Sequence, residues 1–369
     1  MNDALYARVF SNLQERIESG AIDVGERLPT QSQLAEEFGV STITIKHALD
    51  MLDRAGYIKR RPRLGSEVIS RTAGLGAAAR STSTLPTIGC VLTSFDDSFG
   101  TRVLWGILDA SLGRANVVLG RTEGFHDREQ GLLAQYRDLG VDGLILQPGS
   151  SEWIAPAILD LVSTQLPLVI LDRNLDGLPV STVCSDNVAS GRAAAEHLFG
   201  LGHRNIGLVT SSGTVSTLDD RHRGFVYAHA EHALAFTSAH EYRKVSSVVP
   251  DHEVSVDDDL ASLKEFLTTN SHLTGFVASE HAVGLLLVRA LRELGLEVPR
   301  DVSVVSFDAP QHVFDDEVRR FTHIDQHEHA LGRATLESVL AQLSERGRVA
   351  KQVLPTELVV GETTAPPRR

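Results

Sequence analysis

The stretch LPTQSQLAEEFGVSTITIKHALDMLDRAGY, residues 28–57, predicts two short helices joined by a tight turn. Thr30 can cap the first helix, with Gln33 three residues later as its capping-box partner. Gly39 ends that helix because glycine accepts the left-handed backbone of a C-terminal cap. Ser41 is the expected N-cap of the second helix. The apolar residues of the second helix recur at the spacing of one buried face: Ile45, Ala48, Leu49 and Leu52.

The outer face of the second helix and the segment after it carry polar and basic side chains. Thr42, Thr44, Lys46 and His47 could reach base edges and phosphates if the N-terminus of the helix enters a major groove. Residues 57–69 predict two short strands around a turn, a β-wing. Residues 40–71 hold seven lysine and arginine residues against three acidic ones, whereas the whole chain carries a net charge of −13. A basic island on an acidic chain is typical of nucleic-acid binding; the alternative is a solvated, charged hairpin.

We therefore predict a DNA-binding surface in this region. Its candidate residues are Thr30, Gln31, Ser41, Thr42, Thr44, Lys46, His47, Arg60, Arg61, Arg63, Gly65 and Ser66.

Residues 1–70 resemble the winged-helix DNA-binding domain of GntR-type bacterial repressors. The resemblance is carried by the preceding helix at 6–19, GERLPT at 25–30, LAEEFGVS at 34–41 and the Ala-Leu, Leu and Gly-Tyr-Ile positions at 48–58. Two positions depart from the family pattern. Thr42 stands where the family usually has arginine, and residues 64–69 read LGSEVI where its wing usually reads Gly-x-Gly-Thr-Phe-Val. The resemblance thus implies DNA binding but not an operator sequence.

Length and composition indicate an ordinary globular protein with two or three domains. The chain has 369 residues, 42% apolar and 22% charged, against roughly 150 residues per domain. The N-terminal sequence lacks the layout of a signal peptide, and no apolar run approaches the ~18 residues of a membrane span. We expect a cytoplasmic protein without membrane contact. Cys90 and Cys184 lie in apolar runs, which predicts buried, reduced thiols.

A change of composition separates the predicted domains. Residues 70–86, SRTAGLGAAARSTSTLP, are rich in Gly, Ala, Ser and Thr and read as a linker. We predict a winged helix-turn-helix domain at 1–70, a linker at 71–86 and an effector-binding and dimerisation domain at 87–369. In this last domain helical stretches alternate with short apolar runs, at 88–92, 116–120, 143–147, 167–172, 205–210, 244–249, 275–279 and 302–308. That alternation predicts parallel sheets covered by helices, with ligands bound at the carboxyl ends of the strands.

A second resemblance covers roughly residues 87–365. Its motifs are VILDR at 169–173, VCSDN at 183–187, LGHRNI at 201–206, RHRGF at 221–225, VPRDVSVVSFD at 298–308 and LPTELVV at 354–360. This ordered set is similar to the effector domain of LacI/GalR-type sugar-responsive repressors, which are related to periplasmic sugar-binding proteins. A GntR-type head on such a body is the architecture of arabinose-repressor-like regulators. The resemblance implies a two-lobed α/β domain with parallel sheets, crossover strands between the lobes, and a homodimer.

The family pattern also implies where a sugar would bind. Sugars carry many hydroxyls, which carboxylates accept and the rigid fork of arginine can donate to. For Asp172, Arg221 and Asp308 the alternative role is helix capping or an Asp–Arg pair across the cleft. Asp186 and Asn187 are expected to cap a helix or shape the crossover. The candidate effector-binding residues are Ser94, Phe95, Phe99, Asp172, Arg173, Arg221, Ser279, Glu280 and Asp308.

Other motifs predict no further chemistry. His327 and His329 are two residues apart, so on a helix they point in different directions and predict no metal site. The glycine-rich run at 74–80 lacks the Lys-Ser/Thr of a phosphate-binding loop, and no cofactor is predicted. We interpret the chain as a transcriptional repressor that binds a palindromic operator as a homodimer and responds to a carbohydrate. Two alternatives stay open: a non-sugar effector, such as a purine or a sugar phosphate, or none; and a cytoplasmic sugar-binding protein or enzyme.

Overall fold

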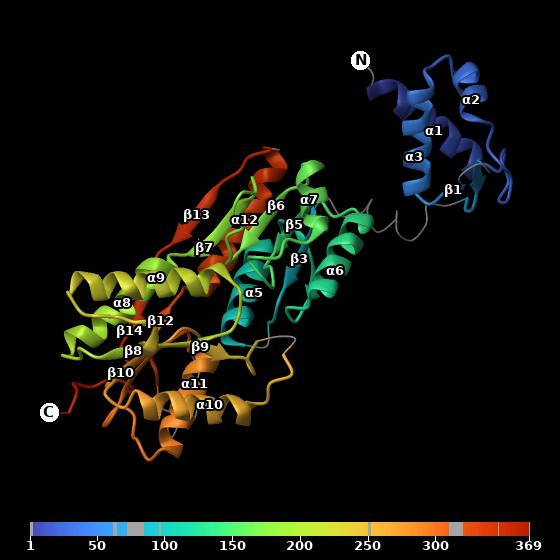
Figure 1. The fold of residues 1–369 in the computed structure, drawn as a ribbon. Helices are drawn as coiled ribbons and strands as arrows, with labels where there is room; N and C mark the ends of the chain where they lie inside the picture. Colours follow the sequence, from blue (N-terminus) through green and yellow to red (C-terminus); the bar gives the residue numbers. More distant parts are fainter. Residues whose placement is uncertain are drawn as a thin grey trace. The chain divides into compact units, whose positions relative to one another are not determined.

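The computed structural model describes residues 3–61, 65–71, 85–95, 97–249, 252–309, 320–345 and 347–368. It separates into two compact units, residues 1–84 and 85–369 (Figure 1), which we call the head and the body. The border between the units falls inside the predicted linker. Among the described residues, no helix is long and apolar enough to cross a membrane.

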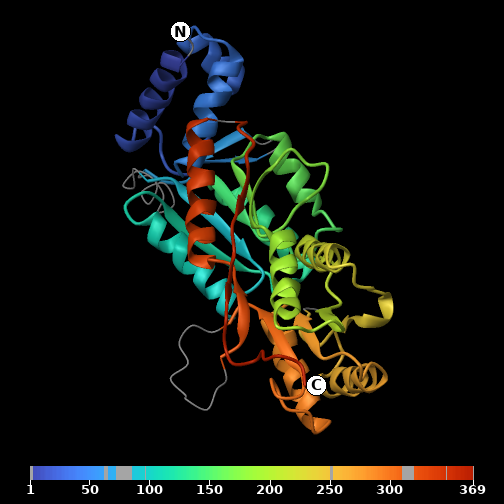
Figure 2. The same ribbon diagram turned by 90° about the vertical axis from the view of Figure 1, so that its left-hand side faces the viewer.

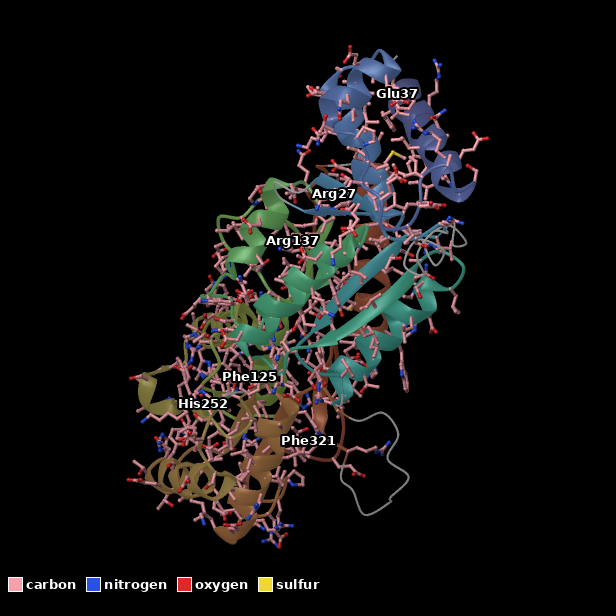
Figure 3. All side chains as sticks on the ribbon, turned by 90° about the vertical axis from the view of Figure 1, so that its right-hand side faces the viewer. Arg27, Glu37, Phe125, Arg137, His252 and Phe321 are labelled. Carbon is pink, nitrogen blue, oxygen red and sulfur yellow. The ribbon has the colours of Figure 1, made fainter. Side chains whose placement is uncertain are left out.

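The head contains the predicted helical pair and the predicted wing. Its elements are α1 (Asp3–Glu18), α2 (Gln31–Phe38), α3 (Thr42–Arg54), β1 (Ile58–Arg61) and β2 (Gly65–Val68). The two strands pair antiparallel, with Ile58 opposite Val68. The apolar faces of the helices meet in one core, in which Leu13, Ile17, Leu34 and Leu52 are fully buried. Glu37, labelled in Figure 3, forms a 2.7 Å ion pair with Arg16 on the surface.

The helix ends of the head form where the sequence predicts them. Thr30 caps α2 and forms a complete capping box with Gln33. Gly39 adopts the left-handed conformation, with φ of 63°, at the end of α2. Ser41 caps α3 by accepting a hydrogen bond from the Thr44 backbone N–H at 3.2 Å. The structure confirms these caps. They could be predicted because each depends on residues three or four positions apart in the sequence.

The body consists of two lobes, each a six-stranded sheet with helices on both faces (Figures 1 and 2). In the first lobe the strand order is β13-β7-β6-β5-β3-β4, and every pair is parallel. The strands are β3 (Thr87–Leu92), β4 (Asn116–Arg121), β5 (Gly143–Leu146), β6 (Leu168–Leu171), β7 (Ser181–Ser185) and β13 (Lys351–Leu354). The helices are α5 (Ser98–Ser111), α6 (His126–Leu139), α7 (Pro156–Ser163) and α12 (Glu328–Ser344).

The second lobe repeats this plan with the order β14-β12-β11-β10-β8-β9, in which the β12–β14 pair is antiparallel. The strands are β8 (Ile206–Ser211), β9 (Glu241–Val245), β10 (Gly275–Ala278), β11 (Ser303–Phe307), β12 (Thr322–Asp325) and β14 (Glu357–Val359). The helices are α8 (Asn187–Gly200), α9 (Ser216–Glu231), α10 (Val256–Thr269), α11 (His281–Glu293) and the short 3₁₀ helix η1 (Ser238–His240). Phe321, labelled in Figure 3, belongs to the core of this lobe.

The chain passes between the lobes from β7 to α8, from β12 to α12 and from β13 to β14. Figure 2 shows the last of these passages in dark red, ending near the C-terminus. Strands buried on both faces explain the continuous apolar runs of the sequence. In β3, for example, Cys90 faces one core of the lobe and Val91 the other. Cys90 and Cys184 are buried free thiols, and burial raises the pKa of Cys90 to about 12.

The predicted strand at 244–249 is wrong in its position, because β9 covers Glu241–Val245. β9 is an edge strand that pairs with β8 alone, and Arg243 and Lys244 in it are exposed. Because β9 contains charged residues, it is not an apolar run, and apolar runs alone could not predict it. Helix α9 begins at Ser216, so Arg221 lies in its second turn.

Candidate functional site

The candidate nucleic-acid interface is the first half of α3. Thr42, Lys46 and His47 are exposed there. The hydroxyls of Ser41 and Thr44 lie 2.9 Å apart and bond to each other. Ile43, which the sequence analysis did not select, is 68% exposed in the first turn of this helix.

The other predicted DNA-binding residues fall into two groups. Thr30 is exposed, but its hydroxyl bonds Gln33 in the capping box; Gln31 is half-buried at the start of α2. In the wing Gly65 is exposed, whereas Ser66 is only 8% exposed and its carbonyl accepts from the Leu28 N–H. Arg63 and the side chains of Arg60 and Arg61 lie outside the described residues.

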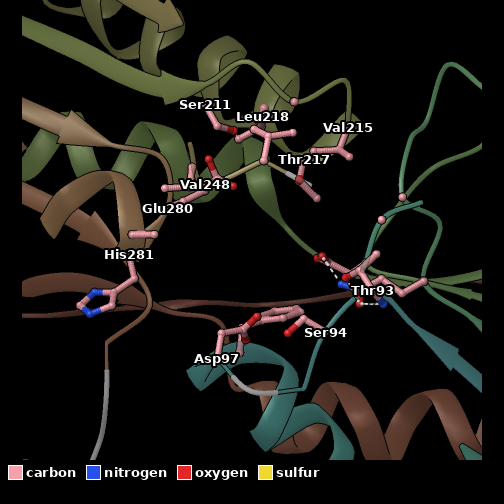
Figure 4. Close-up of a pocket in the computed structure, with 18 of the residues that line it drawn as sticks. Thr93, Ser94, Asp97, Ser211, Val215, Thr217, Leu218, Val248, Glu280 and His281 are labelled. Atoms are coloured by element: carbon pink, nitrogen blue, oxygen red, sulfur yellow. Dashed lines mark hydrogen bonds between the residues drawn. The ribbon is translucent and has the colours of Figure 1, made fainter. Parts of the chain in front are cut away.

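The body holds a cavity of about 550 Å³ between its two lobes (Figure 4), which we call the cleft. Most of the residues that line it lie at or after the carboxyl ends of strands or in the first turns of helices, as expected for α/β sheets. From the first lobe they include Ser94, Asp97, Phe99, Phe125, Gln147, Asp172 and Arg173. From the second lobe they include Ser211, Thr217, Arg221, Glu280, His281, Asp308 and Gln326.

On the side of the first lobe, Asp172 and Arg173 form an ion pair directly after β6. Asp172 is 4% exposed and has a positive φ of 60°. Its Oδ1 atom is buried and has no hydrogen-bond partner among the described residues. Arg173 also reaches across to the second lobe, where its Nη1 lies 3.4 Å from the Thr217 hydroxyl. The pair therefore joins the two walls and leaves one buried carboxylate oxygen of Asp172 without a hydrogen-bond partner among the described residues.

On the side of the second lobe, Arg221 is held by three acceptors. Its guanidinium donates to the Asn187 Oδ1 at 2.8 Å, the Ser279 carbonyl at 2.5 Å and the Gln326 Oε1 at 3.0 Å. The group also lies 4.0 Å above the ring of Phe307. Burial lowers the pKa of Arg221, while the charges of Asp308 and Asp172 raise it. Arg221 is thereby fixed in place as the positive centre of the cleft.

Asp308 sits beside Arg221 at the end of β11. The Gln326 side-chain amide donates to both of its oxygens, at 2.8 and 3.0 Å. Burial raises the pKa of Asp308, and the charge of Arg221 lowers it. Behind it, Glu328 at the start of α12 is fully buried, 2.9 Å from Arg102. Burial and the charge of Asp308 raise the pKa of Glu328 to about 8. Asp308 in the cleft and Glu328 behind it are thus two carboxyl groups that resist ionisation.

Seven of the nine predicted effector-binding residues line the cleft: Ser94, Phe99, Asp172, Arg173, Arg221, Glu280 and Asp308. Phe95 instead packs against a core of the first lobe, and Ser279 contributes its carbonyl to Arg221. Gln147 and Gln326 were missed, although each directly follows a strand. Applying the strand-end rule to every strand would have found Gln147, because β5 is readable in the sequence.

The two N-terminal helix residues Asp186 and Asn187 have different roles. Asp186 caps α8, as expected, by accepting from the Ala189 N–H at 2.9 Å. Asn187 instead orients Arg221. Among the described residues no group of His, Cys, Asp and Glu could hold a metal ion. His327 lies 3.5 Å from Asp325, and His329 lies 2.9 Å from Asp109.

Comparisons with known proteins agree with this division into two units. Residues 5–68 match the family described as bacterial regulatory proteins, gntR family, and residues 195–364 match the periplasmic binding protein-like domain. The arabinose metabolism transcriptional repressor of Geobacillus stearothermophilus is 26% identical over 371 residues, which cover 97% of each chain. The ribose operon repressor of Haemophilus influenzae is 24% identical and covers 86% of this chain and 92% of its own.

Solved structures show the same fold. The transcription regulator CcpA of Lactococcus lactis superimposes with a TM-score of 0.65 at 19% identity, covering 76% of this chain and 99% of its own. A complex of the transcriptional regulator CelR with cellobiose gives a TM-score of 0.63 at 22% identity, covering 91% of this chain and 100% of its own. The chain thus joins a gntR-family helix-turn-helix domain to a periplasmic binding protein-like domain, and its relatives over nearly the whole length are transcriptional repressors.

Proposed function

We propose that this protein is a repressor that binds a palindromic operator as a homodimer, and that a neutral carbohydrate bound in the cleft changes its affinity for DNA. The ligand class is inferred from the charges of the residues that line the cleft and from which of their polar atoms are already paired. Five carboxyl groups line it, of which Asp308 resists ionisation, against three arginines. Arg173 is paired with Asp172, Arg221 with three acceptors and Arg121 with Glu123.

Residues that line the cleft hold buried hydrogen-bonding atoms of both kinds that have no partner among the described residues. Asp172 Oδ1 and Glu280 Oε2 are buried acceptors without a partner among the described residues, and Arg173 Nε and His281 Nδ1 are buried without one too. Figure 4 shows Glu280 and His281 from the second lobe in the same cleft as Ser94 and Asp97 from the first. Hydroxyl groups both donate and accept, so a polyol satisfies this set. A phosphate would lie among surplus carboxylates, which disfavours a sugar phosphate. The names of three of the similar proteins mention arabinose, ribose or cellobiose, which supports the same class.

An exposed apolar strip on the first lobe supports the homodimer. Trp105, Leu108 and Leu112 on or just after α5 are 53%, 38% and 76% exposed, and Leu119 of β4 is 40% exposed. Contiguous apolar surface of this kind marks an interface, and a second copy related by twofold symmetry would cover both strips at once. Two heads would then meet two half-sites of a palindrome. The three passages between the lobes support hinge closure around the ligand as the switch.

The test starts from a duplex selected by the purified protein from a random-sequence library. Affinity for that duplex should fall steeply with salt concentration, because phosphate contacts release counterions. A screen of neutral sugars, sugar phosphates and purines should find a neutral sugar that changes the Kd for the duplex. Lys46→Ala should weaken DNA binding alone, and Asp308→Asn should weaken sugar binding alone. If no duplex is enriched, the regulator is not a sequence-specific DNA-binding protein; if only an anionic ligand acts, the ligand class is wrong.

A further inference from the structure

One large apolar side chain stands out on the polar outer surface of the head. Ile43 is the second residue of α3 and, at 68% exposed, is the most exposed large apolar residue described in the head, ahead of Val24 at 52% and Ile69 at 46%. A single exposed apolar residue needs no explanation by itself. The position of Ile43 suggests a role in DNA contact, because it lies in the first turn of the helix that we propose enters the major groove.

The neighbours of Ile43 define the chemistry of this turn. The Ser41 and Thr44 hydroxyls bond each other at 2.9 Å while Ser41 caps the helix. Lys46 and His47 follow Ile43 by three and four residues, so they lie beside it on one face of the helix, and both are exposed. Ile43 is therefore a branched hydrocarbon group surrounded by side chains that suit phosphates and polar base edges.

We propose that Ile43 contacts the C5-methyl group of a thymine in each half-site of the operator. Thymine is distinguished in the major groove by this methyl group, and apolar side chains recognise it by contact. The N-terminal residues of a recognition helix are those that reach base edges. Contact with a phosphate or with a hydrogen-bonding base edge would desolvate polar groups against a side chain that cannot replace their water. This inference rests on the proposed DNA binding and adds to it the base that one residue reads.

The expected size of the effect follows from burial of one methyl group. A buried methyl contributes ~0.8 kcal/mol, which corresponds to about a four-fold change in Kd. Two symmetric half-sites give about a fifteen-fold change if their contributions add. This range is measurable by fluorescence anisotropy of a labelled duplex.

The experiment replaces thymines of the selected duplex by deoxyuridine, one symmetric pair at a time, which removes only the C5-methyl group. At one pair, the full-length protein should lose about fifteen-fold in affinity. Ile43→Ala should bind the thymine duplex more weakly than the unchanged protein does. It should bind the thymine and the deoxyuridine duplexes with equal affinity. Val24→Ala is the matched control, because Val24 is 52% exposed in the head and lies outside α3. It should discriminate as the unchanged protein does.

Three results would overturn the inference. Equal binding of the unchanged protein to every deoxyuridine duplex would show that no thymine methyl is read. Undiminished discrimination by Ile43→Ala would assign the methyl contact to another residue. A lower thermal midpoint of Ile43→Ala than of Val24→Ala would give Ile43 a structural role. Failure to enrich any duplex at all would instead overturn the proposed function on which this inference depends.

Discussion

At the scale of the residue, Arg221 shows which part of the cleft the sequence could predict. Arg221 was expected in the binding site from the RHRGF motif, and the structure places its side chain in the cleft. Its three acceptors belong to Asn187, Ser279 and Gln326, which are 34, 58 and 105 residues away. No local pattern joins positions so distant, so the network that orients the arginine could not be predicted.

Replacing Arg221 by methionine should destabilise the body strongly. The change keeps the length of the side chain but leaves buried acceptors and Asp308 without their positive partner, a loss of about 3 kcal/mol or more in the free energy of unfolding. Urea denaturation measures it. Arg223→Met is the control in the same helix, because Arg223 is 54% exposed and pairs with Asp220 at 3.2 Å. That change should cost less than about 1 kcal/mol. Equal losses for both variants would show that the buried network contributes little.

Glu328 predicts a specific pH dependence of stability. Its pKa is about 8 in the folded protein and 4.5 as an unperturbed value, so between these pH values the folded state holds a proton that the unfolded state has lost. The contribution of Glu328 to stability is therefore greatest below about pH 4.5 and falls as the pH rises to about 8, by up to ~1.4 kcal/mol per pH unit.

Glu328→Gln, which cannot ionise, removes this contribution. The free energy of unfolding of the unchanged protein should fall relative to that of Glu328→Gln from pH 5 to pH 8. The comparison cancels the groups that titrate independently of Glu328. Parallel stability curves for the two proteins would mean that Glu328 is ionised in the folded state.

At the scale of the element, glycine sets how closely the helices beside the cleft approach. A Cβ atom on Gly224 of α9 would lie 1.9 Å from the Val188 carbonyl oxygen of α8, and one on Gly191 of α8 would lie 2.0 Å from that of Arg221. The two helices thus cross backbone to backbone, and this crossing places Arg221 within reach of Asn187. Caps and turns were predictable because they are local; helix crossings and the edge strand β9 depend on distant partners.

Gly224→Ala should force α9 away from α8, because the clash involves backbone atoms that cannot rotate aside. We expect a loss of about 2 kcal/mol or more in the free energy of unfolding, typical of overpacking, and weaker ligand binding through the displaced Arg221. Gly200→Ala in α8 is the control, since nothing lies within 4 Å of a Cβ atom there. It should be neutral or stabilising, by up to about 1 kcal/mol. A Gly224→Ala protein as stable as this control would contradict the close crossing.

At the scale of the whole molecule, the charge divides between the two units. The basic island lies in the head, on a chain whose net charge is −13, so DNA affinity should depend on few cations. Removing one phosphate contact lowers the slope of log K against log salt by about one. In the proposed homodimer Lys46→Ala removes one contact from each half-site, so the slope should fall by about two without a change in base preference. A slope equal to that of the unchanged protein would place Lys46 away from the phosphates.

The central claim is that occupancy of the cleft and binding of DNA are thermodynamically coupled. The direct measurement is the Kd of the neutral sugar found in the screen, determined by calorimetry on the full-length protein with and without saturating operator duplex. Linkage requires the duplex to change the sugar Kd by the same factor as the sugar changes the duplex Kd. We expect a factor between about 5 and 150, the range of typical coupling energies. A sugar that binds the cleft with the same Kd in both conditions would contradict the account.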